Sequence, residues 1–167
     1  TLSSSSAASD VYKRQVVCPA SLVCHWRAEA AAFYGDELPV LLYAGSAAAR
    51  RAVRGQPVRA SIVIASYDAL RADKAAGAWL AQPGGADGLH GAWLYCVLDE
   101  AHAIGNATSA LALAARRVHA LHRLALSGTP VQNSPAELWA LFDWLLPGYL
   151  GDALSLIHIS EPTRRTP

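Results

Sequence analysis

The segment Trp93-Leu94-Tyr95-Cys96-Val97-Leu98-Asp99-Glu100-Ala101-His102 (WLYCVLDEAH, residues 93–102) decides the fold of this chain. Its first six residues are apolar without interruption, as expected of a strand buried on both faces of a parallel sheet. Two adjacent carboxylates, Asp99 and Glu100, follow at once. Such a pair at the end of a buried strand is costly unless a ligand or a reaction uses it. In parallel sheets the chemistry gathers at the carboxyl ends of the strands, so the segment predicts both a fold and the place of a site.

Short apolar runs alternate with helical patterns on both sides of this segment. Ser134, Pro135 and Glu137 supply the start signals of the last helix. Trp26 is expected in the core, as are Trp139 and Trp144, and Phe33 is expected on a buried helical stripe. The alternation predicts an α/β fold, a parallel sheet with helices on both faces. The expected strands are 16–18, 40–43, 61–65, 93–98 and 123–126, and the expected helices are 21–34, 46–53, 67–80, 106–121 and 134–146.

The two ends of the chain differ from the middle. SDVYKRQ at the front and SLIHISEPTR at the back resemble translated adapter sequence. We therefore expect non-native tails at 1–15 and 154–167 and a domain at 16–153; ordinary disordered tails are the alternative. Within 16–153 there are ten Lys or Arg and eleven Asp or Glu, because four of the 14 basic and two of the 13 acidic residues lie in the ends. This near-zero net charge gives no extended positive surface for nucleic acid, so any DNA contact is expected to be local.

The three cysteines, Cys18, Cys24 and Cys96, form no CxxC pair. This argues against a disulfide framework or a zinc site and fits a reducing compartment. Cys18 and Cys96 lie in apolar runs and are expected in the core. No apolar run approaches the ~20 residues that a membrane helix needs, so no membrane partner is expected.

Asp99, Glu100 and His102 form the first candidate site. Mg²⁺ prefers a carboxylate together with waters and substrate phosphates, so Asp99 could hold this ion. Glu100 could orient and deprotonate an attacking water, since phosphoryl transfer depends mainly on positioning and charge neutralisation. His102 could pass the state of a nucleotide to a neighbouring segment. The alternative is a solvated helix start with acids at the positive end of the helix dipole.

A second motif, LSGTPVQN at 126–133, follows the next expected strand. Ser127 and Thr129 offer hydroxyls at the strand end, and Gly128 allows a tight backbone path. Read alone, Ser-Gly-Thr-Pro would also serve as an ordinary turn. The two motifs in this order are much more specific than either one.

DEAH followed by HRLALSGTPVQN and ELWALFDWLLPGYLG resembles the Swi/Snf-type ATPases of helicase superfamily two. VVCPASLVCHWRAE is similar to motif Ia of that family, and IVIASYDALR to motif Ib. The likeness runs from residue 16 to about 151. It implies the first RecA-like lobe of a P-loop NTPase, in incomplete form. The ending LFDWLLPGYLG is similar to the corresponding sequence in the branch of remodellers that removes TATA-binding protein from DNA.

The resemblance also implies roles for matching residues. Asp99 corresponds to the Mg²⁺ ligand and Glu100 to the water-activating acid, with His102 beside them. The cofactors implied for the complete protein are ATP and Mg²⁺. The partners implied are double-stranded DNA, the second ATPase lobe and either TATA-binding protein or nucleosomes, in the nucleus. Residues implied in coupling nucleotide to DNA are Ser127, Gly128, Thr129 and Gln132, and those implied in DNA contact are Pro19, Ala20, Ser21, Ser66 and Tyr67.

Two parts of such an enzyme do not occur in the sequence. A phosphate-binding loop requires G-x-x-x-x-G-K-[ST], and neither of the two lysines, Lys13 and Lys74, follows a glycine. The second lobe is not present either. We therefore expect negligible ATPase activity from this chain alone, no tight binding of ATP or Mg²⁺, and an exposed apolar sheet edge. Family members commonly carry a Lys before Asn106, where this chain has Gly105.

Two other functions remain as alternatives. One is a lobe of a DEAH-type RNA helicase, although those helicases usually carry a shorter Ser-Ala-Thr motif than SGTPVQN. The other is a non-catalytic interaction fragment, which the missing phosphate-binding loop favours.

Overall fold

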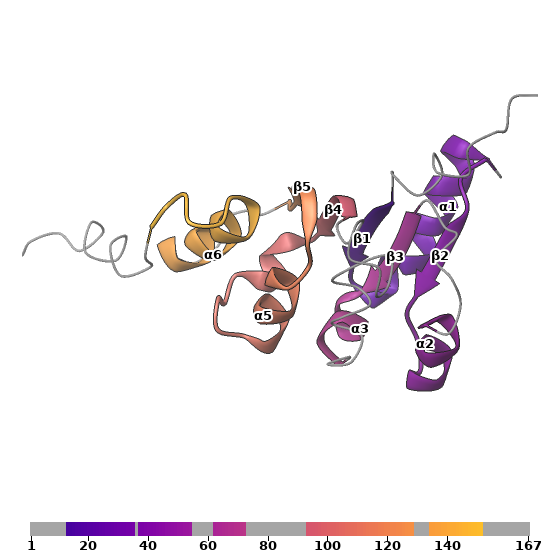
Figure 1. Cartoon of the computed structure of the whole chain (residues 1–167), viewed down its shortest axis with the longest axis horizontal. Helices are drawn as coiled ribbons and strands as arrows, with labels where there is room; N and C mark the ends of the chain where they lie inside the picture. The colour runs from indigo at the N-terminus through magenta and orange to yellow at the C-terminus, as the bar shows by residue number, and fades with distance from the viewer. Residues whose placement is uncertain (1–12, 36, 55–61, 73–92, 129–133, 152–167) are drawn as a thin grey trace, which may run out of the picture.

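The computed structural model describes residues 13–35, 37–54, 62–72, 93–128 and 134–151. The five described strands form one parallel sheet in the order β2-β3-β1-β4-β5 (Figure 1). The predicted α/β class with a parallel sheet is therefore confirmed. The strands are β1 (Arg14–Cys18), β2 (Val40–Tyr43), β3 (Ile62–Ser66), β4 (Trp93–Asp99) and β5 (Ala120–Leu126). The helices are α1 (Val23–Tyr34), α2 (Ala47–Arg54), α3 (Tyr67–Ala72), α5 (Ala110–Arg116) and α6 (Pro135–Leu145), with short 3₁₀ helices η2 (Ala20–Leu22) and η4 (Ala101–Ile104).

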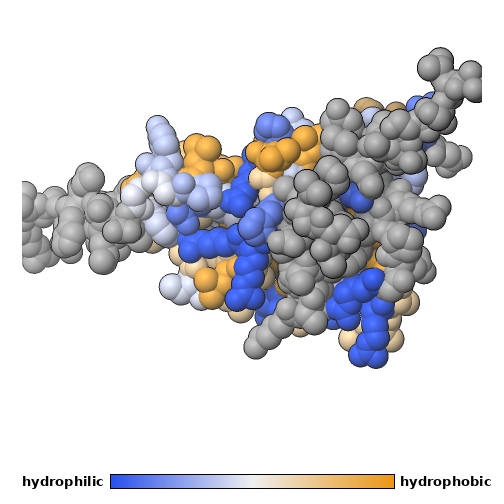
Figure 2. All heavy atoms as spheres, viewed as in Figure 1, coloured by the Kyte–Doolittle hydropathy of each residue, from blue (hydrophilic) through white to orange (hydrophobic). Residues whose placement is uncertain are grey.

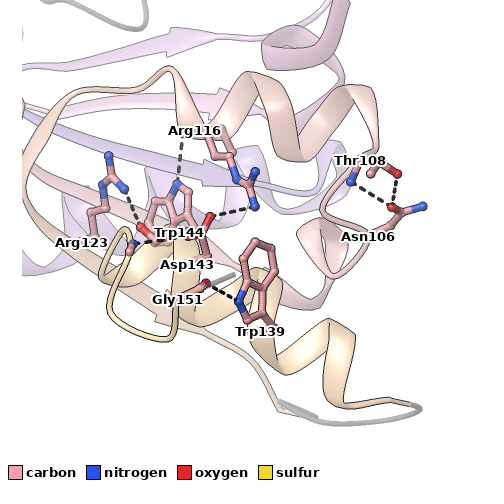
Figure 3. A network of polar contacts seen from close by, with 10 residues as sticks. Asn106, Thr108, Arg116, Arg123, Trp139, Asp143, Trp144 and Gly151 are labelled. Atoms are coloured by element: carbon pink, nitrogen blue, oxygen red, sulfur yellow. Dashed lines mark hydrogen bonds and ion pairs between the residues drawn. The ribbon is translucent and has the colours of Figure 1, made fainter. Parts of the chain in front are cut away.

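The largest difference from the expected elements is in α5, which is much shorter than the helix predicted at 106–121. The Asn106 side chain accepts hydrogen bonds from the backbone and hydroxyl of Thr108, at 3.1 and 2.9 Å, and so makes a turn (Figure 3). Ser109 then caps the helix by accepting from Ala112 N at 3.1 Å. At the far end, Ala120 already belongs to β5. For the helix expected at 67–80, the part beyond Ala72 lies outside the described residues.

Helices cover both faces of the sheet, but unequally. In Figure 1, α1 lies above the strands and α2, α3 and α5 lie below them. The α1 face holds a small core built on Val16, Val23 and Ile64. The opposite face holds the main core, which includes Trp93, Leu98, Tyr67 and Trp144. The helices of that face therefore supply most of the packing.

No described helix covers the α1 face of the sheet over β4 and β5. Tyr95, Leu124 and Leu126 are 41%, 47% and 36% exposed there, and β5 is an edge strand among the described residues. Figure 2 shows hydrophobic surface in this region. Phe33 was expected to be buried, but it is 79% exposed. The expectation was wrong because Phe33 lines an open groove between α1 and β4 instead of packing in the core. The apolar surface seen here belongs to a face of the sheet, and the exposed apolar edge expected from the sequence stays a prediction.

Two of the three thiols are buried. Burial, followed by the nearby charge of Asp99, raises the pKa of Cys18 to about 11, and burial raises the pKa of Cys96 to about 12. Cys24 is exposed on α1, and all three cysteines are free. The core positions expected for Cys18 and Cys96 are confirmed. None of the described helices is long and apolar enough to cross a membrane.

Strand β1 begins at Arg14, so Arg14 and Gln15 belong to the central strand although they precede the predicted domain limit. The Gln15 side chain is fully buried, and its Nε2 has no hydrogen-bond partner among the described residues. Its Oε1 receives only a weak contact from Cys96 Sγ at 4.0 Å. The strand thus carries an amide where its apolar surroundings favour a hydrocarbon side chain.

Replacing Gln15 by the similarly shaped Met is expected to raise the free energy of unfolding by about 1–3 kcal/mol, because an unsatisfied buried amide carries a desolvation cost of this size. Urea unfolding followed by circular dichroism measures the change. Gln15→Glu is the matched opposite, and it should lower stability because it buries a charge. Equal stability of the Met variant and the parent chain would mean that the amide is satisfied.

Candidate functional site

The predicted site residues lie at neighbouring strand ends along one edge of the sheet. Cys18, which ends β1, is in register with Ser66, which ends β3. Asp99, which ends β4, is in register with Leu126, which ends β5. Because all strands are parallel, the turns that follow them stand side by side. Their order along the edge is Ser66–Tyr67, Pro19–Ser21, Asp99–Glu100 and then Ser127–Gly128.

Asp99 is held by three hydrogen bonds. Its Oδ1 accepts from Glu100 N at 3.0 Å, and its Oδ2 accepts from Trp26 Nε1 at 2.8 Å. Its backbone carbonyl accepts from the Tyr67 hydroxyl at 2.8 Å. The carboxylate is only partly buried, so it stays reachable while its orientation is fixed.

Glu100 has a left-handed backbone, with φ 54° and ψ 50°, and no other described residue except glycine has a positive φ. For an L-residue this conformation costs roughly 1–2 kcal/mol. It turns the chain sharply from β4 into η4 and leaves the carboxylate half-exposed. Glu100 Oε2 lies 3.3 Å from His102 Nδ1, and both side chains are near 45% exposed, at 42% and 46%. The structure therefore pairs two of the predicted catalytic residues.

The geometry of this edge is compatible with a magnesium ion carried by a nucleotide. Among the described residues no three His, Cys, Asp or Glu side chains gather into an all-protein metal cage. Mg²⁺ commonly uses one or two carboxylates and completes its shell with water and phosphate, so a single oriented aspartate is sufficient. Each carboxylate oxygen of Asp99 accepts one hydrogen bond, from Trp26 or from Glu100 N, and keeps a lone pair. Asp99 thus keeps the free lone pairs that a metal ligand requires.

The residues predicted to contact DNA fall into an exposed and a buried group. Ala20 and Ser21 are exposed in η2, and Pro19 precedes them at the end of β1. Ser66 is 3% exposed and accepts from Ala69 N at 3.1 Å, and Tyr67 is 8% exposed. Burial, and then the charge of Asp99, raises the pKa of Tyr67, so its hydroxyl remains a donor at all ordinary pH values. Direct DNA contact by any of these residues stays a prediction.

Two of the four residues predicted to couple nucleotide to DNA are described. Ser127 is half-buried and Gly128 is exposed, directly after β5 and next to the end of β4. Thr129 and Gln132 lie outside the described residues. The neighbouring strand ends place the Ser127 turn beside the Asp99 turn, which is the arrangement that a coupling role needs.

Trp26 was expected in the core, and it packs against the small core on the α1 face, but it also contacts the candidate site. It is half-buried, and its indole N–H is directed to the Asp99 carboxylate. The signal was available, because a buried indole usually finds a partner for its N–H. The expected helix at 21–34 also starts directly after a strand end at the same edge. Trp144, in contrast, is a core residue as expected, at 1% exposure.

Comparison with known proteins gives one family. The model of the SNF2-related domain matches residues 4–157. Among curated proteins, TATA-binding protein-associated factor BTAF1 of Arabidopsis thaliana is 43% identical over 143 residues, which is 85% of this chain and 6% of that protein. TATA-binding protein-associated factor MOT1 of Saccharomyces cerevisiae is 43% identical over 136 residues, 81% of this chain and 7% of that protein. TATA-binding protein-associated factor 172 of Homo sapiens is 39% identical over 138 residues, with the same shares.

A solved structure agrees with this fold. The Sulfolobus solfataricus SWI2/SNF2 ATPase core in complex with dsDNA matches with a TM-score of 0.71 and 24% identity, over 91% of this chain and 29% of that one. The five-stranded sheet is therefore a RecA-like lobe. The chain spans less than a tenth of the length of the curated relatives above. With a family model matched over nearly its whole length, this chain belongs to the SNF2-related family.

Proposed function

We propose that this chain is part of the first ATPase lobe of an ATP-dependent DNA translocase. The observation that carries the proposal is the placement of Asp99 and Glu100 at the carboxyl edge, between the turns at Pro19–Ser21 and Ser127–Gly128. In this arrangement the segments proposed to hold DNA are only one strand away from the acidic turn. A structural change caused by the nucleotide can therefore reach them directly. Mg²⁺, when bound with ATP, would neutralise charge on the phosphates.

The protein groups have distinct tasks in this proposal. Asp99 orients the metal-bound nucleotide, directly or through water. Glu100 accepts a proton from the attacking water, and its half-exposed carboxylate beside His102 is reachable for this purpose. The exposed backbone at Ala20 and Ser21, at a helix start, suits a DNA phosphate. Because the domain is nearly neutral, local contacts of this kind are favoured, and a broad basic surface is not.

The relatives refine the proposal. Three proteins similar to this chain are named TATA-binding protein-associated factors. We infer that the complete protein acts in the nucleus on complexes of TATA-binding protein with double-stranded DNA. In this proposal, catalysis by the complete protein also uses the second ATPase lobe and a phosphate-binding loop, a motif that residues 1–167 do not contain.

The test compares this chain with the complete protein from the same locus. Phosphate release is measured with ATP and Mg²⁺, with and without double-stranded DNA. We expect turnover that DNA stimulates in the complete protein, and none above background in the isolated chain. A complete protein that releases no phosphate under either condition would refute the translocase and favour the interaction fragment. Stimulation by RNA in place of DNA would favour the RNA helicase.

A further inference from the structure

The Trp26–Asp99 hydrogen bond joins two elements that are far apart in sequence, at a separation of 73 residues. Trp26 lies in the first turn of α1, which begins just after the exposed Ala20–Ser21 turn. Asp99 ends β4. The bond therefore ties the carboxylate to the helix that follows one of the segments proposed to contact DNA.

Trp26 is the residue that orients the Asp99 carboxylate, because the other contacts of Asp99 do not. The second bond to its carboxylate comes from the adjacent N–H of Glu100, which moves with Asp99 itself. The Tyr67 hydroxyl holds the backbone carbonyl and not the carboxylate. Among the described contacts, only the indole fixes the carboxylate against a separate element. Trp26 and Asp99 both line a groove of about 720 Å³ beside β1, β3 and β4, so this side of the candidate site is open.

The chemistry of the donor suits a metal ligand. An indole N–H donates one hydrogen bond and accepts none, and it carries no charge at any ordinary pH. A Lys or Arg in its place would also orient the carboxylate, but it would cancel the negative charge and repel a divalent cation. A neutral donor fixes the orientation of Asp99 and leaves its charge available.

We propose that Trp26 is a positioning residue, which holds the Asp99 carboxylate in the orientation that receives the magnesium of a bound nucleotide. This inference rests on the proposed ATPase function. Donors that orient a metal ligand typically change metal affinity by about 10- to 100-fold when they are lost. The effect falls on magnesium and not on the nucleotide, because the hydrogen bond described for Trp26 goes to the Asp99 carboxylate.

The experiment uses the complete protein with Trp26→Phe. Binding of a fluorescent, non-hydrolysable ATP analogue is followed by anisotropy while Mg²⁺ is titrated. We expect the half-saturating Mg²⁺ concentration to rise about 10-fold, with analogue affinity unchanged in the absence of Mg²⁺. Trp139→Phe is the matched control, because it also removes an indole hydrogen bond, to Gly151 O at 3.1 Å, but lies away from Asp99. This control should keep the parental Mg²⁺ dependence.

A second replacement keeps the test valid if the Trp26→Phe protein does not fold. β-(3-benzothienyl)alanine at position 26 keeps the shape of the indole and replaces only the N–H by sulfur, so packing is preserved. An unchanged half-saturating Mg²⁺ concentration in this folded variant would overturn the proposal. If analogue binding already ignores Mg²⁺ in the parent protein, both this inference and the ATPase fail. A Glu100→Gln protein provides the separate test of the proposed function. If it binds the analogue with Mg²⁺ but does not hydrolyse ATP, the ATPase proposal stands, and a negative result for position 26 then counts against Trp26 alone.

Discussion

Changing Glu100 to Gln in the complete protein is expected to lower ATP turnover by about 100- to 10,000-fold, the usual contribution of a positioned general base. The amide has nearly the shape of the carboxylate but cannot accept the proton of the attacking water. Glu100 is half-exposed and its side chain contacts His102 at 3.3 Å, so the change leaves the core untouched. Phosphate release is measured at saturating ATP, Mg²⁺ and double-stranded DNA.

Two variants make this result specific. Glu37→Gln, an exposed glutamate between α1 and β2, is the matched control and should keep parental turnover. Glu100→Gly should also lose turnover, yet it should raise the free energy of unfolding by roughly 1 kcal/mol, because glycine relieves the left-handed backbone at φ 54°. Loss of activity together with gain of stability marks strain that is kept for function. Parental turnover in Glu100→Gln would remove Glu100 from the mechanism.

The sequence predicted the parts of the fold in which several signals agree. The apolar run before Asp99 predicted a strand, and β4 lies where the sequence placed it. The expected burial on both faces was wrong, because Tyr95 on the α1 face is 41% exposed. Ser134, Pro135 and Glu137 predicted the start of α6, where Ser134 accepts from Glu137 N at 3.4 Å. Strand ends in a parallel sheet share one edge, so the grouping of the Asp99 and Ser127 turns followed from topology alone.

Other features depended on contacts between distant residues, which a local pattern does not contain. Phe33 has the helical spacing of a core residue, but its burial requires a layer over β4 and β5 that the described part of the chain does not supply. Trp26 fits the same helical stripe, and only the position of β4 makes it a partner of Asp99. Periodicity thus identified the inner face of α1 but not what that face meets.

The departure at Gly105 shows a similar limit. The sequence suggested a missing basic contact near the acidic motif. In the structure, a Cβ at this buried position would lie 3.1 Å from the carbonyl oxygen of His102 and 3.2 Å from Glu137 Cγ. A larger side chain would have to move Glu137 at the start of α6. The glycine is therefore explained by packing between η4 and α6, which the motif alone did not reveal.

Trp144→Ala is expected to lower the free energy of unfolding by roughly 3–5 kcal/mol, the usual cost of removing a large core side chain. Trp144 is 1% exposed, and its Nε1 donates to Ala115 O at 3.1 Å (Figure 3). The Arg123 guanidinium lies 5.4 Å from its ring centroid and also donates to the carbonyls of Trp144 and Val118, at 2.5 and 3.1 Å. The alanine therefore opens a cavity and loosens the junction of α5, α6 and β5 together.

Trp139→Ala on the same helix separates this effect from loss of helix propensity or aromatic surface. Trp139 is only half-buried, with Arg116 5.5 Å from its ring centroid, so its loss should cost roughly 1 kcal/mol or less. Urea unfolding of both variants, followed by circular dichroism, gives the two values. Since single domains hold only about 5–15 kcal/mol in total, Trp144→Ala should remove a large share of the stability of this chain. Equal costs for the two tryptophans would mean that α6 is not part of the core and that the sheet is stable without it.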